Sequence, residues 1–218
     1  MKKIKSFSFQ GIKGAYSELA GKKLFPEAEG IPSQTFEEMF DLVRSEKADA
    51  AMVPIENSLA GRVADIHYLL PKYKLQIHAE HFQKVEHNLL CKKDAELKDI
   101  KFIRSHAQAI GQCQNIININ KFKTIISADT AGSAKDLSQG SEKNIAAIAS
   151  ELSAQIYNLK ILKKNIEDEK GNVTRFLVMG KNVKQPEYDK NKKFITTCIF
   201  RLKSEPAALY KCLGGFAT

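Results

Sequence analysis

The sequence predicts an α/β fold with two lobes, and three observations lead to this prediction. Short apolar segments of strand length alternate with segments of helical period through most of the chain, a pattern typical of a largely parallel sheet covered by helices. Polar residues follow the strand-like segments of the second half. Extended segments at 74–92 and at 159–166 with 175–180 separate a first group of strands and helices from a second. We therefore expect two lobes joined by two crossings, with a ligand site in a cleft between them.

The composition is that of a globular protein. The chain has 218 residues, of which 43% are hydrophobic and 27% are charged, enough for one sizeable domain or two small lobes. No apolar run reaches the length of a membrane span, and residues 1–11 contain two lysines but no hydrophobic signal segment. We expect a cytoplasmic protein without a membrane partner.

The charged and metal-binding residue types do not indicate a nucleic-acid or metal site. The net charge is +9, but the lysines are scattered in pairs, without a basic helix or a nucleic-acid-binding motif. The four cysteines are far apart and form no CxxC pair, and the histidines lack a matching cluster of ligands. The glycines near residue 11 match no dinucleotide or phosphate-loop pattern. We expect no nucleic acid, no metal and no nucleotide.

The first lobe begins with a strand over 4–9 and a helix starting near Tyr16, after a glycine-containing turn. Residues 35–47 follow a helical hydrophobic period, and Thr35 with Glu38 fits a capping box at its start. An apolar strand over 48–53 is expected to stop at Pro54, which cannot donate a backbone hydrogen bond. A further helix is expected over 63–70.

The second lobe shows three strands that each end in polar residues just before a helix. In open α/β sheets this carboxyl edge is where ligands bind, because loops and helix N-termini converge there. The strands are expected at 100–106, 123–130 and 144–150, and the helices at 107–118, 131–138 and 150–157.

A polar linker over 181–193 separates these lobes from a strand-like segment, 194–202, and a helix-like segment, 204–217. One strand and one helix cannot bury a sheet face, so we expect the opening of a second domain whose remainder is missing. The domains are thus predicted at 1–182 and 194–218. In the first, lobe 1 takes about 1–77 plus 160–182 and lobe 2 about 78–159.

Two polar clusters are candidates for binding an anion. Glu56, Asn57 and Ser58 follow the buried strand and could hydrogen-bond a hydroxylated anion, although Asn57 or Ser58 could instead cap a helix. Ser105 stands at a strand end, and Gln112 follows two helical turns later on roughly the same face. Ser105 could also cap that helix and present its N-terminus to an anion.

The segment GNVTRF, residues 171–176, places a hydroxyl beside a guanidinium. Arg175 can hold a carboxylate with two parallel hydrogen bonds, and Thr174 supplies a short hydroxyl donor. No Ser/His/Asp arrangement or Cys/His pair has a spacing that indicates a nucleophile. These residues favour a reaction that positions an anion and donates one hydrogen bond to a leaving group.

Taken in order, seven motifs resemble the prephenate dehydratase family over residues 7–180. They are GAYSE, PIENSLAGR, HNLL, SHAQAIGQC, DTAGSA, AAIAS and GNVTRF, with Ala107 where the family usually has proline. The resemblance implies a catalytic domain of two lobes like a type II periplasmic binding protein. It implies a monofunctional enzyme, since the motifs begin within ten residues of Met1, and a truncated ferredoxin-like ACT regulatory domain at the C-terminus.

The resemblance also implies the reaction: decarboxylating dehydration of prephenate to phenylpyruvate, water and CO2 in L-phenylalanine biosynthesis, with no cofactor. By resemblance, Thr174 would donate to the departing hydroxyl and Arg175 would bind a carboxylate. The remaining catalytic residues would be Glu56, Asn57, Ser105 and Gln112. Substrate-binding residues would include Arg175, Asn57, Ser58 and Ser105, with Phe176 packed beneath the site.

Two alternative functions stay open at the level of sequence. Arogenate dehydratase acts on a substrate with an amino acid side chain in place of the pyruvyl group. A noncatalytic two-lobed sensor would close on an aromatic acid without turnover. The expected partners are prephenate, an L-phenylalanine effector if the ACT domain is complete, and further copies of the chain in a homodimer or homotetramer.

Overall fold

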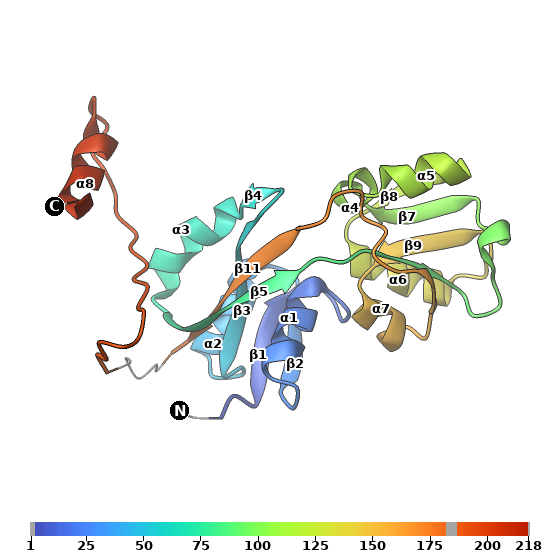
Figure 1. The fold of residues 1–218 in the computed structure, drawn as a ribbon. Coiled ribbons are helices and arrows are strands. Elements are labelled where there is room, and N and C mark those ends of the chain that lie inside the picture. Colours follow the sequence, from blue (N-terminus) through green and yellow to red (C-terminus); the bar gives the residue numbers. More distant parts are fainter. Residues whose placement is uncertain (1–2, 182–186, 218) are drawn as a thin grey trace. The chain divides into compact units, whose positions relative to one another are not determined.

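A computed structural model describes residues 3–181 and 187–217 of the chain (Figure 1). The chain divides into two units, Met1–Lys184 and Gln185–Thr218. The first contains both predicted lobes, built on two separate sheets.

The first sheet has the strand order β2-β1-β3-β11-β5, with β4 paired to the end of β3. Its first three strands are parallel, whereas β11 runs antiparallel to both of its neighbours. The strands are β1 (Ser6–Gln10), β2 (Glu29–Ser33), β3 (Ala50–Asn57), β4 (Gly61–Arg62), β5 (Gln76–Lys84) and β11 (Val173–Gly180), and the helices are α1 (Tyr16–Leu24), α2 (Phe36–Arg44) and α3 (Ala64–Tyr73).

The helix predicted from residue 35 is confirmed as α2. The Thr35 side chain accepts a hydrogen bond from the Glu38 N–H at 3.1 Å, as an N-cap should. The Glu38 carboxylate accepts from the N–H of Gln34 at 2.8 Å, one residue earlier than in the expected capping box. The helix buries Met39 and Phe40 in the core of the first lobe.

The prediction that Pro54 ends the strand is wrong, because β3 continues to Asn57. A register shift in the β3–β11 ladder accounts for the difference. Arg175 lies opposite Glu56 and Phe176 lies opposite Pro54, so that Ile55 is an extra residue on β3. Such a bulge accommodates a proline within a strand, and it extends β3 far enough to bring its polar end beside the start of β11.

The second sheet has the order β10-β6-β9-β7-β8, in which β7, β8 and β9 are parallel. The three strands predicted in this lobe are therefore present. The elements are β6 (Asn88–Cys91), the 3-10 helix η1 (Leu97–Asp99), β7 (Phe102–His106), α4 (Ala107–Gly111), α5 (Gln114–Asn120), β8 (Lys123–Ser127), α6 (Thr130–Gln139), β9 (Ile145–Ala149), α7 (Glu151–Ile156) and β10 (Lys160–Lys163).

The single helix predicted over 107–118 is instead two helices, α4 and α5. The carboxylate of Asp168 accepts from the N–H groups of Gln114 and Asn115 at 2.7 and 3.0 Å, which caps a new helix start. The Asp168 N–H donates to the Gln112 carbonyl at 2.7 Å. The helical segment is thus interrupted at Gln112. Asp168, which is distant in sequence, stabilises this interruption.

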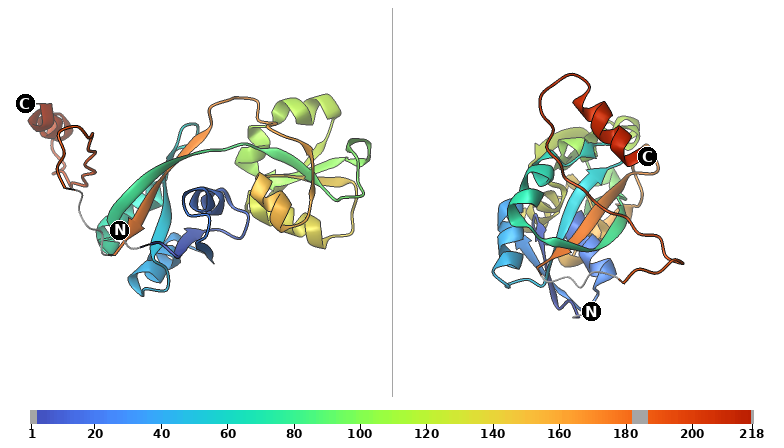
Figure 2. Two further views of the ribbon diagram at one scale, coloured as in Figure 1. Left: turned by 60° about the horizontal axis from the view of Figure 1, so that its bottom comes forward. Right: turned by 90° about the vertical axis from the view of Figure 1, so that its left-hand side faces the viewer.

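Two crossings join the sheets, as predicted, and β5 and β11 run side by side in the first sheet (Figure 2). One crossing lies at 85–87, between β5 and β6, and the other at 164–172, between β10 and β11. The lobe boundaries expected near 77 and 160 differ from this topology. Most of β5 belongs to the first sheet and β10 to the second.

Direct hydrogen bonds also connect the lobes beside the crossings. The hydroxyls of Ser150 and Ser153, at the start of α7, donate to the Gly14 carbonyl at 2.7 and 2.9 Å. The Tyr157 hydroxyl donates to the Lys13 carbonyl at 2.7 Å. Gly14 has a φ of +91°, and a Cβ there would lie 2.6 Å from Ser153 Oγ, so this close approach requires glycine.

In residues 187–217 of the second unit there is one helix, α8 (Ala208–Ala217), within the region predicted to be helical. The strand predicted over 194–202 is not formed. A strand needs a neighbour for its backbone N–H and C=O groups, and the described residues of this unit contain no strand that could pair with it. Throughout residues 3–181 and 187–217, no helix is both long and apolar enough to span a membrane.

Candidate active site

The β3–β11 ladder brings the polar cluster at 56–58 together with the GNVTRF segment. Thr174 lies opposite Asn57, and Arg175 lies opposite Glu56. These four residues come from the PIENSLAGR and GNVTRF segments, which are more than a hundred positions apart. The bulge at Ile55 sets this register, since it lets β3 continue past Pro54.

Asn57 is held by the backbone that follows it. Its Oδ1 accepts from the N–H groups of Leu59 and Ala60 at 3.0 and 2.9 Å. This is a local turn and not a helix cap, because α3 begins only at Ala64. The Asn57 Nδ2 group donates to Thr174 Oγ1 at 2.9 Å.

This contact determines what the Thr174 side chain can do. Its oxygen accepts from Asn57, and within the described part of the chain its hydroxyl hydrogen has no acceptor. The side chain is half-buried rather than enclosed. The Thr174 hydroxyl hydrogen is therefore available for donation to a ligand, as the role predicted from the sequence requires.

Ser58 ties the two segments together and does not cap a helix. Its hydroxyl donates to the Gly171 carbonyl and accepts from the Val173 N–H, each at 2.9 Å. Its own N–H donates to the Val173 carbonyl at 2.9 Å. Ser58 thus holds the start of β11 in place.

Arg175 contacts two carboxylates. Its Nε and Nη2 lie 3.0 and 2.9 Å from one oxygen of Glu80, and its Nη1 lies 3.3 Å from Glu56. Burial acts to lower the pKa of the guanidinium, but the hydrogen bonds to Glu56 and Glu80 raise it above its usual value. The Phe82 ring centroid lies 5.9 Å from its central carbon. A substrate carboxylate would compete with these two acids.

A chain of side-chain hydrogen bonds runs from Asn57 into the second lobe. Asn57 Nδ2 lies 2.6 Å from Asn172 Oδ1, and Asn172 Nδ2 lies 3.0 Å from Gln112 Oε1. The same Gln112 oxygen lies 2.9 Å from His87 Nε2. The Tyr16 hydroxyl lies 2.9 Å from His87 Nδ1 and 2.8 Å from the Glu86 carbonyl.

Sequence reasoning missed four of these residues: Glu80, Asn172, His87 and Tyr16. Asn172 and His87 are each 3% exposed, although both are polar. Three of the four lie in the motifs GNVTRF, HNLL and GAYSE, so the signal was present without an assigned role. Glu80 lies in β5 outside those motifs, and only its pairing with β11 reveals it.

Ser105 is placed differently from the expectation of ligand contact, and Phe176 is buried. Ser105 is fully buried within β7, and its hydroxyl donates to the Ile148 carbonyl at 2.7 Å. His106, not Ser105, occupies the N-cap of α4. Phe176 is 2% exposed and packs in the core of the first lobe with Phe7. Direct contact of either side chain with a ligand is not supported by these positions.

No group among the described residues has the arrangement of an activated nucleophile. No serine, threonine or cysteine in 3–181 or 187–217 is hydrogen-bonded to a histidine. Burial and the nearby acids Asp168 and Glu167 raise the pKa of the Cys113 thiol, which makes it less reactive. In the same residues, no three His, Cys, Asp or Glu side chains gather as metal ligands would.

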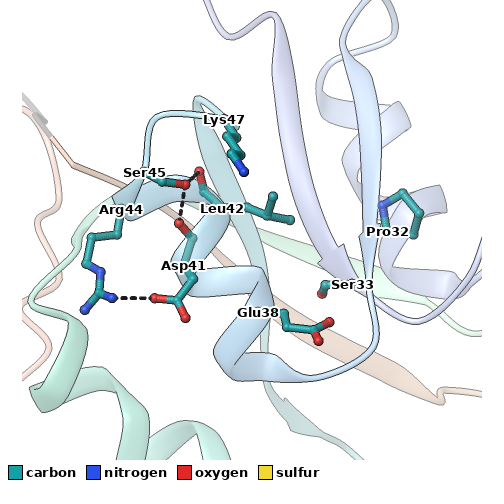
Figure 3. Close-up of a pocket in the computed structure, with 8 residues that line it drawn as sticks. All are labelled: Pro32, Ser33, Glu38, Asp41, Leu42, Arg44, Ser45 and Lys47. Atoms are coloured by element: carbon teal, nitrogen blue, oxygen red, sulfur yellow. Dashed lines mark hydrogen bonds and ion pairs between the residues drawn. The ribbon is translucent and has the colours of Figure 1, made fainter.

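A hollow of about 460 Å³ lies beside α2, away from the predicted site (Figure 3). Three of its polar residues, Asp41, Arg44 and Ser45, bind one another. Arg44 Nη2 lies 2.8 Å from Asp41, and the Ser45 hydroxyl donates to the Asp41 carbonyl at 2.7 Å. The lining residues are Pro32, Ser33, Glu38, Asp41, Leu42, Arg44, Ser45 and Lys47. None of them is a predicted site residue.

A smaller hollow of about 260 Å³ lies where α1, the first crossing and α7 meet, and Tyr16 lines it. Two of its lysines are paired: Lys84 with Glu86 at 2.9 Å, and Lys164 with Glu151 at 2.7 Å. The side chains in this hollow thus neutralise one another for the most part, and it contains none of the predicted site residues.

Comparison with known proteins decides the family. Residues 7–184 match the family described as prephenate dehydratase. The chain belongs to this family. A prephenate dehydratase from Arthrobacter aurescens, solved in complex with L-Phe, superposes with a TM-score of 0.83 at 28% identity, covering 97% of this chain and 72% of that one. The predicted two-lobed α/β fold of the prephenate dehydratase family is thereby confirmed. The predicted ACT domain is not shown within this chain.

Among curated relatives, the "Bifunctional N-acyl-homoserine lactone acylase/prephenate dehydratase" of Komagataeibacter europaeus is 41% identical over 214 residues, which is 97% of this chain and 75% of that one. The "Arogenate dehydratase/prephenate dehydratase 1, chloroplastic" of Arabidopsis thaliana is 40% identical over 210 residues, covering 96% of this chain and 53% of that one. The chain thus spans about half the length of that plant relative.

Proposed function

We propose that this protein converts prephenate to phenylpyruvate with loss of water and CO2. The observation that carries the proposal is the Thr174 hydroxyl, whose oxygen accepts from Asn57 while its hydrogen has no acceptor within the described residues. A donor of this kind suits a reaction in which a hydroxyl group must leave. Membership of the prephenate dehydratase family supports the same reaction.

The proposed step breaks two bonds of the substrate. The bond between the ring and its carboxylate breaks to release CO2, and its electron pair enters the ring. The ring becomes aromatic as the C–O bond breaks, and the departing hydroxide takes up a proton to leave as water. Aromatisation supplies much of the driving force, so the enzyme needs mainly to stabilise charge on the departing oxygen.

Thr174 donates a hydrogen bond to that departing oxygen. A threonine hydroxyl is a very weak acid, so full proton transfer from it is unfavourable early in the step. We therefore assign Thr174 as a positioned donor. Asn57 fixes its direction, and Ser58 holds the backbone on either side of Asn172, at Gly171 and Val173.

Arg175 binds a substrate carboxylate in the proposed complex. Glu56 and Glu80 hold its guanidinium in the free protein, and the substrate carboxylate takes over part of these contacts. Gln112 offers an amide group beside Asn172. For Ser105 and Phe176 we propose support from within the lobes in place of direct contact, because both are buried.

The proposal is tested by incubating the purified protein with prephenate near neutral pH and identifying the products. Phenylpyruvate and CO2 are expected in equal amounts. Binding of prephenate without turnover would instead indicate the noncatalytic sensor, and the Thr174→Ala variant would then bind as tightly as the parent.

Arogenate is the alternative substrate, because the plant relative is named for both activities. The two substrates differ only in the side chain that carries the pyruvyl or the amino acid group, and no residue described above separates them. Parallel assays with each substrate decide the point. If phenylalanine forms from arogenate while prephenate is left unchanged, the activity of the protein is that of an arogenate dehydratase and not of a prephenate dehydratase.

The acylase activity named for the Komagataeibacter relative is a second candidate, supported by the 41% identity over 97% of this chain. The local chemistry favours it less, since no serine, threonine or cysteine among the described residues has a histidine partner. Incubation with an N-acyl-homoserine lactone tests it directly. Release of homoserine lactone and a free fatty acid would add this activity to the chain.

The remaining expectations are proposals of the same kind. We place the catalytic domain at 1–182 and the beginning of an ACT domain at 194–218, in the cytoplasm, with L-phenylalanine as an effector if that domain is complete. The Arthrobacter relative was solved with L-Phe bound. Prephenate turnover with and without L-phenylalanine tests the effector, and sedimentation analysis tests whether the protein is a homodimer or homotetramer.

A further inference from the structure

A network of side-chain hydrogen bonds connects the two lobes. From Asn57 to the Nε2 atom of His87, only one assignment of donors and acceptors is consistent. The starting point is Asn57. A backbone N–H can only donate, so the Asn57 atom that meets Leu59 N and Ala60 N must be the oxygen. The Asn57 amide nitrogen then faces Asn172 and Thr174 and donates to both.

The direction of each later hydrogen bond follows in turn. The Asn172 atom facing Asn57 must be its oxygen, so its amide nitrogen faces Gln112 and donates to Gln112 Oε1 at 3.0 Å. That oxygen also faces His87 Nε2 at 2.9 Å. A carbonyl oxygen can only accept, so His87 Nε2 must carry a hydrogen.

The Tyr16 hydroxyl lies 2.9 Å from the other ring nitrogen, Nδ1, and 2.8 Å from the Glu86 carbonyl. A hydroxyl has one hydrogen and can donate to only one of these two atoms at a time, so the assignment rests on the Gln112 contact and not on Tyr16. His87 is 3% exposed and packs edge-on to the Tyr16 ring, with ring centroids 5.7 Å apart. The charged group nearest to it in the network is Glu167, whose carboxylate accepts from the His87 backbone N–H at 2.9 Å.

Two hydrogen-bond donors of this network have no acceptor among the described residues. Gln112 Oε1 receives two hydrogen bonds, whereas Gln112 Nε2 has no acceptor among the described residues. The hydroxyl hydrogen of Thr174 likewise has no acceptor among these residues. Both free groups are donors of the kind that an anionic substrate would accept from.

We propose that His87 is a positioning residue for the dehydratase reaction: its Nε2–H holds the Gln112 carboxamide so that the amide hydrogens of Gln112 are offered to the substrate. This inference rests on the proposed function. His87 does not touch the substrate and acts through Gln112. Loss of the Nε2–H would leave Gln112 Oε1 with Asn172 as its one donor among the described residues, so the carboxamide would be held less firmly.

Kinetic assays of His87 variants test the role. His87→Leu removes the donor, and we expect kcat to fall about 10- to 100-fold, as for a misplaced group at a reacting centre, with KM changed much less. His87→Gln places an amide N–H near the position of Nε2 and should recover a large part of kcat. Thermal unfolding shows whether each variant is folded. Equal losses in the two folded variants, or no loss in His87→Leu, would overturn the proposal.

An NMR measurement on the parent protein separates this inference from the proposed function. With ¹⁵N-labelled histidine, the correlation pattern of His87 should be that of a neutral ring protonated at Nε2. A parent ring protonated at Nδ1 alone would refute the assignment, even if prephenate is turned over. Failure to turn over prephenate would refute the proposed function and would leave the hydrogen assignment of His87 standing.

Discussion

At the residue scale, the Asn57 carboxamide decides which way the Thr174 hydroxyl can act. Its oxygen is occupied by two backbone N–H groups, and its nitrogen donates to Thr174 Oγ1. At position 57, a side chain of equal size that can only accept hydrogen bonds would reverse the direction of the bond to Thr174. The hydroxyl hydrogen of Thr174 would then turn toward position 57 and away from the substrate.

Asn57→Asp should therefore lower kcat for prephenate by about 100-fold, the scale of losing one donor to a developing oxyanion. The backbone contacts to Leu59 and Ala60 are retained, but the hydrogen bond to Asn172 Oδ1 is lost, so the variant should unfold at a lower temperature than the parent while remaining folded. Steady-state kinetics with calorimetry as the folding control measure both effects. Unchanged kcat in a folded variant would show that the orientation of Thr174 is unimportant.

Arg175→Ala is expected to raise KM and lower kcat together, because the guanidinium binds the substrate in both the ground state and the transition state. Arg175→Lys keeps the charge but not the paired N–H geometry. It should recover part of the binding and little of the turnover. If both variants matched the parent in kcat/KM, Arg175 would have no role in the reaction.

The buried imidazole of His87 predicts a pH effect on stability. Burial lowers its pKa in the folded protein, although the hydrogen bond to Gln112 and the charge of Glu167 act in the opposite direction. The unfolded chain then binds a proton more readily, with a pKa of about 6.5. The free energy of unfolding should fall as pH drops below that value, toward the lower folded pKa.

Urea unfolding at several pH values measures this effect. Below a pH of about 6.5, the free energy of unfolding should decrease less in His87→Gln than in the parent, because glutamine does not titrate. The comparison is needed because burial also lowers the pKa of His78, which both proteins contain. Identical pH profiles would mean that His87 is not a buried neutral group.

At the element scale, the turn before α1 is fixed against the start of α7 through Gly14. An added methyl group would lie 2.6 Å from Ser153 Oγ and 3.0 Å from its Cα, at a φ of +91°. Gly14→Ala should cost roughly 1–3 kcal/mol of stability, the scale of a residue held in an unfavourable backbone region. Chemical denaturation measures the loss.

Gly111→Ala is the matched control. Gly111 ends the helix α4 and has open space around the position of a Cβ. The substitution there should be neutral or slightly stabilising, because alanine restricts the unfolded chain. Similar destabilisation by both variants would show that the contact between Gly14 and α7 is unimportant for stability.

The elements that sequence could predict are those determined by local patterns. The helix after Thr35 and the three parallel strands of the second lobe follow from hydrophobic period and capping. The strand through Pro54 was missed because the bulge depends on β11, more than a hundred residues away. The break between α4 and α5 was missed because Asp168 caps α5 from 54 positions along the chain.

The same distinction holds for the candidate site. The residues of PIENSLAGR and GNVTRF were predicted from their chemistry, and strand pairing brings them together. Glu80 and the path through Asn172 to His87 could not be predicted, because partners in a hydrogen-bond network are determined by tertiary packing. Ser105 has the residue type of a ligand-binding group but a fully buried position.

At the scale of the whole molecule, the site residues belong to both lobes of the first unit. Thr174, Asn57 and Arg175 lie in the first sheet, whereas Gln112 and His87 reach the same network from the second lobe and the crossing. Activity should therefore depend on the connection between the lobes as well as on each lobe. Family membership indicates that this two-lobed unit is the part that carries the proposed reaction.

The most direct test of the account is the turnover of prephenate by the parent, Thr174→Ser and Thr174→Ala. If Thr174 is the donor to the departing hydroxyl, the alanine variant should lose about 100- to 1000-fold in kcat with a nearly unchanged KM. The serine variant, which keeps the hydroxyl, should retain a substantial part of the parent rate. An alanine variant that turns over prephenate as fast as the parent would contradict the account.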